Sequence, residues 1–159
     1  MGSTSRAGLL RDRFGPDFTS LTYNGNYNAF VVKIGALIDL EGSVAVGGAP
    51  VVGAKTILKN LATRAKLKTT TDAAGAYQFG VVAAGNYKIT IQRVGVTTTT
   101  TVSGTVEVRE APSVGNKVTL KNLETKAKVD TTTDSTGAFS FAGVVPGSHK
   151  LTVATVTIP

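Results

Sequence analysis

The chain carries one structural unit twice. Aligning Ala49 with Ala111 sets an offset of 62 residues (111 minus 49), and this register holds without a gap from Gly42 to Ile91 of the first copy, with roughly half of the positions identical. A fixed period of this kind indicates an internal duplication. A unit of about 60 residues buries only about 60% of the surface that its unfolded chain exposes. Each copy alone is therefore expected to be marginally stable.

Short β-strands are predicted throughout each copy. Runs of β-branched and aromatic residues, such as KTILKN and AYQFG, lie between Gly, Pro, Asn and Asp residues, which favour turns. In the run NYKITI, Tyr87, Ile89 and Ile91 alternate with Lys88 and Thr90, as expected for a strand with one buried face. We therefore expect an all-β chain without long helices.

Two aspartates recur at equivalent positions, in the sequences DAAG and DSTG that follow the threonine runs. Asp72 and Asp134 can accept hydrogen bonds from the backbone ahead of them, and Gly75 and Gly137 can adopt positive φ without strain. Because the two carboxylates lie in separate copies and each has a structural role, we expect two tight turns and not a catalytic pair.

Both copies resemble the carboxypeptidase regulatory-like family. The first contains GAPVVGAK, TTTDAAGAYQF and GNYKI, and the second contains TTTDSTGAFSF and PGSHKL. Ala84 stands where the family pattern usually has Pro, and His149 stands where it usually has Tyr. The resemblance implies a prealbumin-like or immunoglobulin-like fold, and hence two tandem small antiparallel β-sandwiches with an N-terminal arm. It implies little about function, because such sandwiches serve many roles.

Three parts are expected along the chain: an arm (residues 1–27), a first sandwich with an extra leading strand (28–103) and a second sandwich (104–159). The run RVGVTTTTTVSGTVEV joins the copies without a Pro-rich or Ser-rich linker, which predicts end-to-end stacking with restricted motion; a flexible tether is the alternative. If residues 94–103 complete the first copy, the second is short of part of a strand. We expect the surplus material from Tyr27 onward to cover an open sheet edge, in its own subunit or in a neighbour.

The net charge of +7 is unevenly distributed. Residues 42–103 hold seven basic and one acidic side chain, whereas residues 104–159 hold six and five. The excess in the first copy indicates either attraction to a polyanion or a solvated, solubilising surface.

The sequence contains no group of residues typical of a catalytic, metal or phosphate-binding site. The chain has no Cys and one His, so a transition-metal site is not expected. The Gly-rich stretches lack the contiguous Gly-Lys-Ser/Thr ending and the following helix of a phosphate loop. His149 aligns with Tyr87, which favours a packed side chain over a general base. No stretch reaches the roughly 20 apolar residues of a membrane span, and the first residues lack the apolar segment of a secretory signal. We expect no enzyme activity, no cofactor and no metal.

The function expected by elimination is that of a structural or assembly protein. The favoured class is a phage virion component (capsid decoration, fibre or tail subunit) made in the host cytoplasm, which attaches through its N-terminal arm and sheet edges. The alternatives are a secreted or surface bacterial adhesion or carbohydrate-binding module and a basic polyanion-binding module.

Expected partners are proteins, by self-association into a homo-oligomer or by contact with a capsid or surface protein. Carbohydrate is a further option, and neither specific nucleic acid nor membrane is expected. An arm that becomes ordered on its partner is the functional interpretation of the first residues, and a disordered tail is the alternative. The residues expected to contact a partner are Arg6, Arg11, Arg13, Phe14, Phe18, Tyr23, Tyr27 and Phe30.

Overall fold

The computed structural model describes residues 21–22, 30–31 and 39–159. The chain divides into two units, Met1–Leu37 and Ile38–Pro159. In the first unit, β1 (Leu21–Thr22) and β2 (Phe30–Val31) form an antiparallel pair, with Leu21 opposite Val31.

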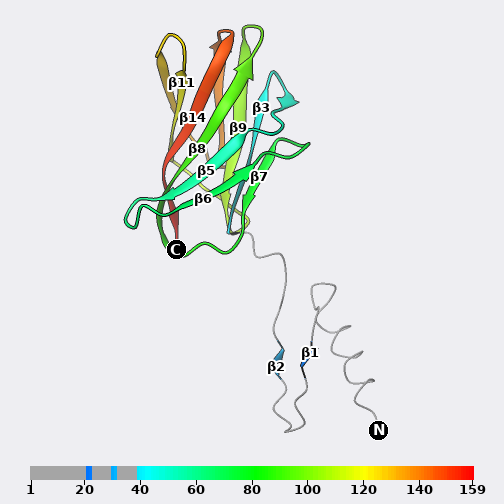
Figure 1. Cartoon of the computed structure of the whole chain (residues 1–159), viewed down its shortest axis with the longest axis vertical. Coiled ribbons are helices and arrows are strands. Elements are labelled where there is room, and N and C mark those ends of the chain that lie inside the picture. The colour runs from blue at the N-terminus through cyan, green and yellow to red at the C-terminus, as the bar shows by residue number, and fades with distance from the viewer. Residues whose placement is uncertain (1–20, 23–29, 32–38) are drawn as a thin grey trace. The chain divides into compact units, whose positions relative to one another are not determined.

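The second unit contains two antiparallel sheets, whose strands are joined by turns and loops within residues 39–159 (Figure 1). The all-β, sandwich-like fold class is thereby confirmed. The strands are β3 (Leu40–Val46), β4 (Ala49–Pro50), β5 (Lys55–Asn60), β6 (Lys66–Thr70), β7 (Ala76–Phe79), β8 (Gly85–Val96), β9 (Thr100–Val108), β10 (Ala111–Pro112), β11 (Lys117–Asn122), β12 (Lys128–Thr132), β13 (Ala138–Val144) and β14 (Gly147–Ile158).

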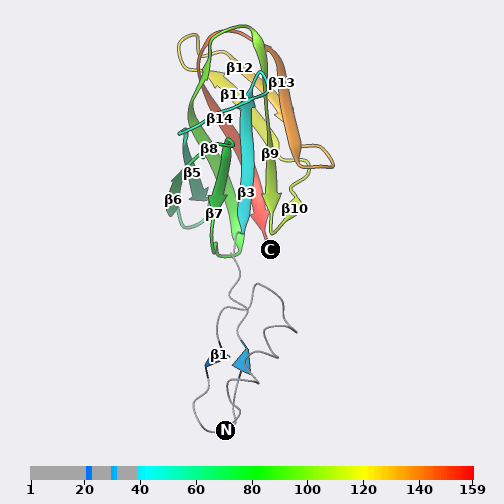
Figure 2. The same cartoon turned by 90° about the vertical axis from the view of Figure 1, so that its right-hand side faces the viewer.

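Each sheet takes half of its strands from each copy. In the β3–β9 sheet, β3 and β9 lie side by side (Figure 2), with β4 and β7 along the outer edge of β3 and with β10 and β13 along the outer edge of β9. The β8–β14 sheet has the order β12-β11-β14-β8-β5-β6. Each copy is thus a small sandwich of its own, and the two sandwiches are joined edge to edge in both layers.

A local twofold axis relates the copies. Ser43 pairs with Thr105 in the β3–β9 sheet, and Thr90 pairs with Thr152 in the β8–β14 sheet. Each of these pairs joins residues that are 62 positions apart. Antiparallel strands that pair at equivalent positions are related by a twofold axis through the pair, so the axis runs through both sheets. The bulges between β8 and β14 follow the same symmetry, because the register shifts on both sides of the axis. The equivalent residues Arg93 and Thr155 both have positive φ, 60° and 58°.

One hydrophobic core serves both copies. The inward side chains of the central strands, such as Leu40 and Val106 in one sheet and Ile89 and Leu151 in the other, are fully buried in a single cluster. The alternation predicted for NYKITI is confirmed, because Tyr87, Ile89 and Ile91 are buried while the residues between them face outward. A shared core accounts for the stability that a unit of about 60 residues lacks alone.

The expected end-to-end stacking is wrong. The copies lie side by side, because β3 pairs with β9 and β8 pairs with β14 along most of their lengths. Restricted motion of one copy relative to the other was expected together with the stacking, and it is consistent with the two shared sheets.

The second copy is also not short of a strand. β14 has 12 residues, as does its equivalent β8, and residues 100–103 begin the first strand of the second copy. Of the segment expected to cover a sheet edge, residues 30–31 pair with β1, and residues 28–29 and 32–38 lie outside the described part of the chain.

Two glycines allow the central strands to pack beneath aromatic rings. Gly42 pairs with Tyr77, and a Cβ at Gly42 would overlap both the Tyr77 ring and the carbonyl oxygen of Thr105. Gly104 has the same relationship to Phe139 and to the neighbouring strand. Glycine is therefore required here by close approach and not by a positive φ.

Candidate polyanion-binding face

Nine lysines occupy outward positions of the β8–β14 sheet. On β5 and β11, Lys residues alternate with buried side chains, so they point away from the core. Residues that pair directly across neighbouring strands share a face, which places the other lysines on the same side. We call this surface the lysine face; it consists of Lys55, Lys59, Lys66, Lys68, Lys88, Lys117, Lys121, Lys128 and Lys150.

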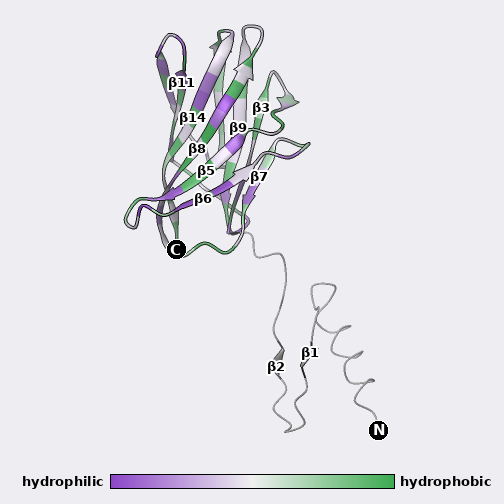
Figure 3. Ribbon diagram, in the orientation of Figure 1, coloured by the Kyte–Doolittle hydropathy of each residue, from purple (hydrophilic) through white to green (hydrophobic). Residues whose placement is uncertain are grey.

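Six of these lysines form two rows related by the twofold axis. One row runs across β12, β11 and β14, where Lys121 pairs with both Lys128 and Lys150. The other runs across β6, β5 and β8, where Lys59 pairs with both Lys66 and Lys88. Directly opposed side chains have Cβ atoms about 5 Å apart, and like charges at this distance destabilise a sheet. Hydrophilic segments recur on the strands of this sheet in Figure 3.

Little negative charge compensates the lysine face. Asp130 of β12 is the only carboxylate at an outward strand position of this sheet within residues 39–159. It accepts hydrogen bonds from Thr119 (2.6 Å) and Lys117 (3.0 Å). The Thr119 hydrogen bond and then the Lys117 one hold the pKa of Asp130 below its usual range. Asp130 therefore stays ionised and neutralises one lysine of nine.

The acidic side chains of the second copy lie mostly elsewhere. Glu110 and Glu124 lie in turns, and Asp134 caps the turn after β12. Glu107 pairs with Glu41 on the outer surface of the β3–β9 sheet. The charge balance of the second copy thus conceals a separation of charge between faces.

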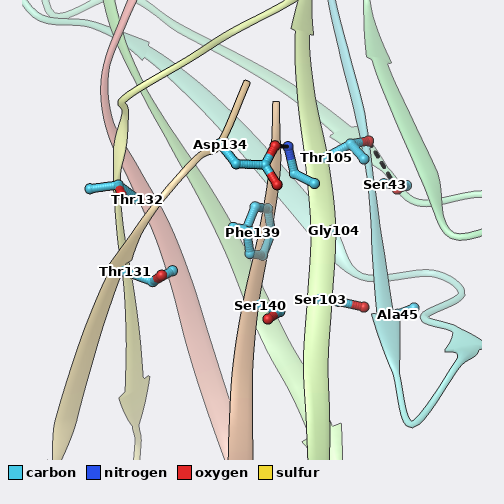
Figure 4. A pocket seen from close by; sticks show the side chains of 11 residues that line it. Ser43, Ala45, Ser103, Gly104, Thr105, Thr131, Thr132, Asp134, Phe139 and Ser140 are labelled. Atoms are coloured by element: carbon cyan, nitrogen blue, oxygen red, sulfur yellow. Dashed lines mark hydrogen bonds between the residues drawn. The ribbon is translucent and has the colours of Figure 1, made fainter. Parts of the chain in front are cut away.

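A hollow of about 580 Å³ lies on the outer surface of the other sheet, the β3–β9 sheet (Figure 4). Small side chains such as Ala45, Ser103 and Ser140 line it, and Asp134 is the charged residue at its rim. The Asp134 carboxylate accepts hydrogen bonds from Thr136 Oγ1, Thr136 N and Ala138 N at 2.7–3.1 Å, and these bonds hold its pKa below the usual range. The carboxylate is thus committed to stabilising the turn.

The turn roles expected for the two aspartates are confirmed. Asp72 Oδ1 accepts bonds from Ala74 N and Ala76 N at 2.8 and 3.0 Å, and Gly75 has φ 73°. Gly137 has φ 74° in the equivalent turn.

His149 is packed, as expected. The residue is 3% exposed, its Nδ1 lies 3.1 Å from the Gly147 carbonyl oxygen, and its Nε2 lies 3.4 Å from Asn122 Nδ2. With the proton on Nδ1, the ring donates to the carbonyl and accepts from the amide. Within residues 39–159, His, Cys, Asp and Glu side chains form no group of three suited to a metal ion.

The residues expected to contact a partner are not brought together by the described structure. Phe30 lies in β2, where it pairs with Thr22. The other seven lie outside the described residues: Arg6, Arg11, Arg13, Phe14, Phe18, Tyr23 and Tyr27. Their role in binding stays a prediction.

The net charge of each segment does not predict the lysine face, because that face depends on which side of a strand each lysine occupies. A signal was present: KTILKN and KVTLKN each carry lysine at the first and fifth residue, which point to one side of a strand. Applied to both copies, this alternation places lysines of the second copy beside those of the first.

Residues 39–159 define an all-β sandwich module with a strongly basic sheet surface. The family model for the carboxypeptidase regulatory-like domain matches residues 39–114 and 101–157, and the chain belongs to this family. The two matches correspond to the tandem copies. No curated protein and no solved structure matches the chain. Among the described residues, no helix is long and apolar enough to cross a membrane.

Proposed function

We propose that this chain is a non-enzymatic attachment protein whose lysine face holds a polyanionic polymer or surface. The observation that carries the proposal is the gathering of nine lysines, with one carboxylate, on a single sheet surface. Each lysine that neutralises an anionic group releases condensed counterions, which gives a large electrostatic contribution to binding without sequence recognition.

The energetic cost of the lysine rows supports a binding role. Lys59 lies between Lys66 and Lys88, and Lys121 lies between Lys128 and Lys150, so the repulsion is repeated in both copies. Solubility requires charge but does not require like charges directly opposite one another. A polyanion would relieve this repulsion on binding.

The sheet edges give less support to self-association. The edge strands of the β8–β14 sheet are β6, which carries Lys66 and Lys68, and β12, which carries Lys128. Charged side chains on an edge strand oppose pairing with another sheet. Assembly through sheet edges, a homo-oligomeric state and a place in a virion stay predictions from the sequence.

Salt-dependent binding tests the proposal. The purified full chain is titrated into fluorescently labelled long-chain polyphosphate, heparin and poly-glutamate at several salt concentrations. We expect binding whose log K falls linearly with log salt. The variant Lys88→Gln/Lys150→Gln should reduce the magnitude of that slope by about 2.

A matched control separates this face from net charge. Ala45→Glu/Ser140→Glu lowers the net charge by the same two units, but on the outer surface of the opposite sheet. It should leave the slope nearly unchanged. Equal weakening by both variants, or no binding of any of the three polymers by the natural chain, would overturn the proposal.

A further inference from the structure

The lysine face is hollowed on one side of the twofold axis. A hollow of about 360 Å³ lies over β12, β11, β14 and β8, and this volume is near the lower end for small-ligand sites. Five lysines line it: Lys88, Lys117, Lys121, Lys128 and Lys150. The remainder of its lining is small, namely Thr119, Thr152 and Ala154.

The twofold axis shows which residues create the hollow. The equivalent place in the first copy keeps lysine at each of the five positions: Lys150, Lys55, Lys59, Lys66 and Lys88. It differs in size, because Ile57 replaces Thr119 and Gln92 replaces Ala154. The two halves therefore share these five lysines, and the second-copy half has the smaller side chains at the two positions that differ.

We propose that this hollow is a specific seat for one multivalent oxyanion unit, a phosphorylated or sulfated group of the bound polymer. The inference rests on the proposed function and adds an anchor point to it. A flat surface of lysines binds anions at no fixed position, whereas a recess lined by lysine side chains fixes one anionic unit in place. Thr152 adds a hydroxyl group to the lining.

Asp130 moderates this seat. Its carboxylate holds Lys117 Nζ at 3.0 Å, so four of the five lysines are uncompensated. In the first copy the equivalent of Asp130 is Lys68. Asp130→Asn keeps the shape of the side chain and frees Lys117, and should tighten anion binding several-fold.

Calorimetric titration of the full chain with small anions tests the inference. Tripolyphosphate and a trisulfated heparin disaccharide serve as separate probes, one for phosphate and one for sulfate. We expect one of them to bind with 1:1 stoichiometry. Ala154→Gln, which fills the hollow with the side chain of its twin and removes no charge, should weaken that binding at least tenfold. Thr119→Ile, added to it, should abolish the binding.

The matched control opens the twin instead. Ile57→Thr/Gln92→Ala changes the same positions in the first copy, leaves the net charge unchanged and should not weaken binding at the original site. Urea denaturation verifies that each variant is folded. Unchanged tripolyphosphate and disaccharide affinity in Ala154→Gln, or no 1:1 binding of either probe while long polymers still bind, overturns the seat and leaves the proposed function standing. Absence of polymer binding overturns both.

Discussion

The hydroxyl oxygens of Ser43 and Thr105 lie 3.1 Å apart, at equivalent positions of the two copies and on the axis that relates them. This contact therefore joins the copies at the centre of the β3–β9 sheet. Ser43→Ala, Thr105→Val and the double variant form a double-mutant cycle. We expect a coupling energy of about 0.5–1.5 kcal/mol in urea denaturation. Additive single effects would show that the hydrogen bond does not contribute to joining the copies.

Close packing beneath the aromatic rings makes glycine irreplaceable at two sites. Gly42→Ala places a methyl group against the Tyr77 ring and the neighbouring backbone, and should reduce the free energy of unfolding by about 3 kcal/mol. Gly95→Ala is the matched control, because nothing lies within 4 Å of its Cβ position and its φ is not positive. The control should be within about 0.5 kcal/mol of the natural chain. A similar loss at both positions in denaturant melts would contradict this account.

The hairpin between β9 and β10 stores backbone strain that its twin avoids. Arg109 and Glu110 have φ of 49° and 63°, where the first copy has Gly47 and Gly48. Arg109 also makes an ion pair with Asp39 (Nε to Oδ1, 3.3 Å), so it is best retained. Glu110→Gly should raise the free energy of unfolding by about 0.5–1 kcal/mol, after allowance for the flexibility of glycine in the unfolded chain.

The reverse change checks this strain in the same protein. Gly48→Glu should lower the stability by a similar amount. Thermal melts that show a loss for Glu110→Gly would exclude strain as the dominant effect.

The turn at Asp134 should make stability depend on pH. Its hydrogen bonds lower the folded-state pKa below the unfolded value of about 3.9, so the stabilisation is fully present above that value and is lost as pH falls through the lower folded pKa. Asp134→Asn should be less stable than the natural chain at pH 7, and the difference should shrink below about pH 4. Melting temperatures of both proteins from pH 2 to 7 measure it. A difference that is constant across this range would assign the effect to the turn geometry and not to the charge.

Local sequence pattern was sufficient for the strands and turns but not for their assembly. Alternation around Tyr87 and the Asp-x-x-Gly turns each depend on a few neighbouring residues. The choice of partner strand does not, because β3 and β9 have nearly the same sequence pattern and either could form an edge. The threonine run also conceals a strand boundary, because residues 97–99 form the bend between β8 and β9 without Gly, Pro or Asn to mark it.

The candidate site needed the register of the sheet. Lys121 and Lys150 are 29 positions apart in sequence and pair directly in the structure. Counting charge along the chain mixes these lysines with Glu110 and Glu124, which lie in turns. The size difference between Ala154 and Gln92 acquires meaning only once the twofold axis shows that they occupy matching places.

The pairing of β3 with β9 and of β8 with β14 gives the chain the arrangement of a symmetric homodimer in which one polypeptide supplies both protomers. Because the two halves are covalently joined, they need not be identical, and the sequence of one copy can change while that of the other is retained. An excised first copy would expose the β3 and β8 edges and should therefore dimerise.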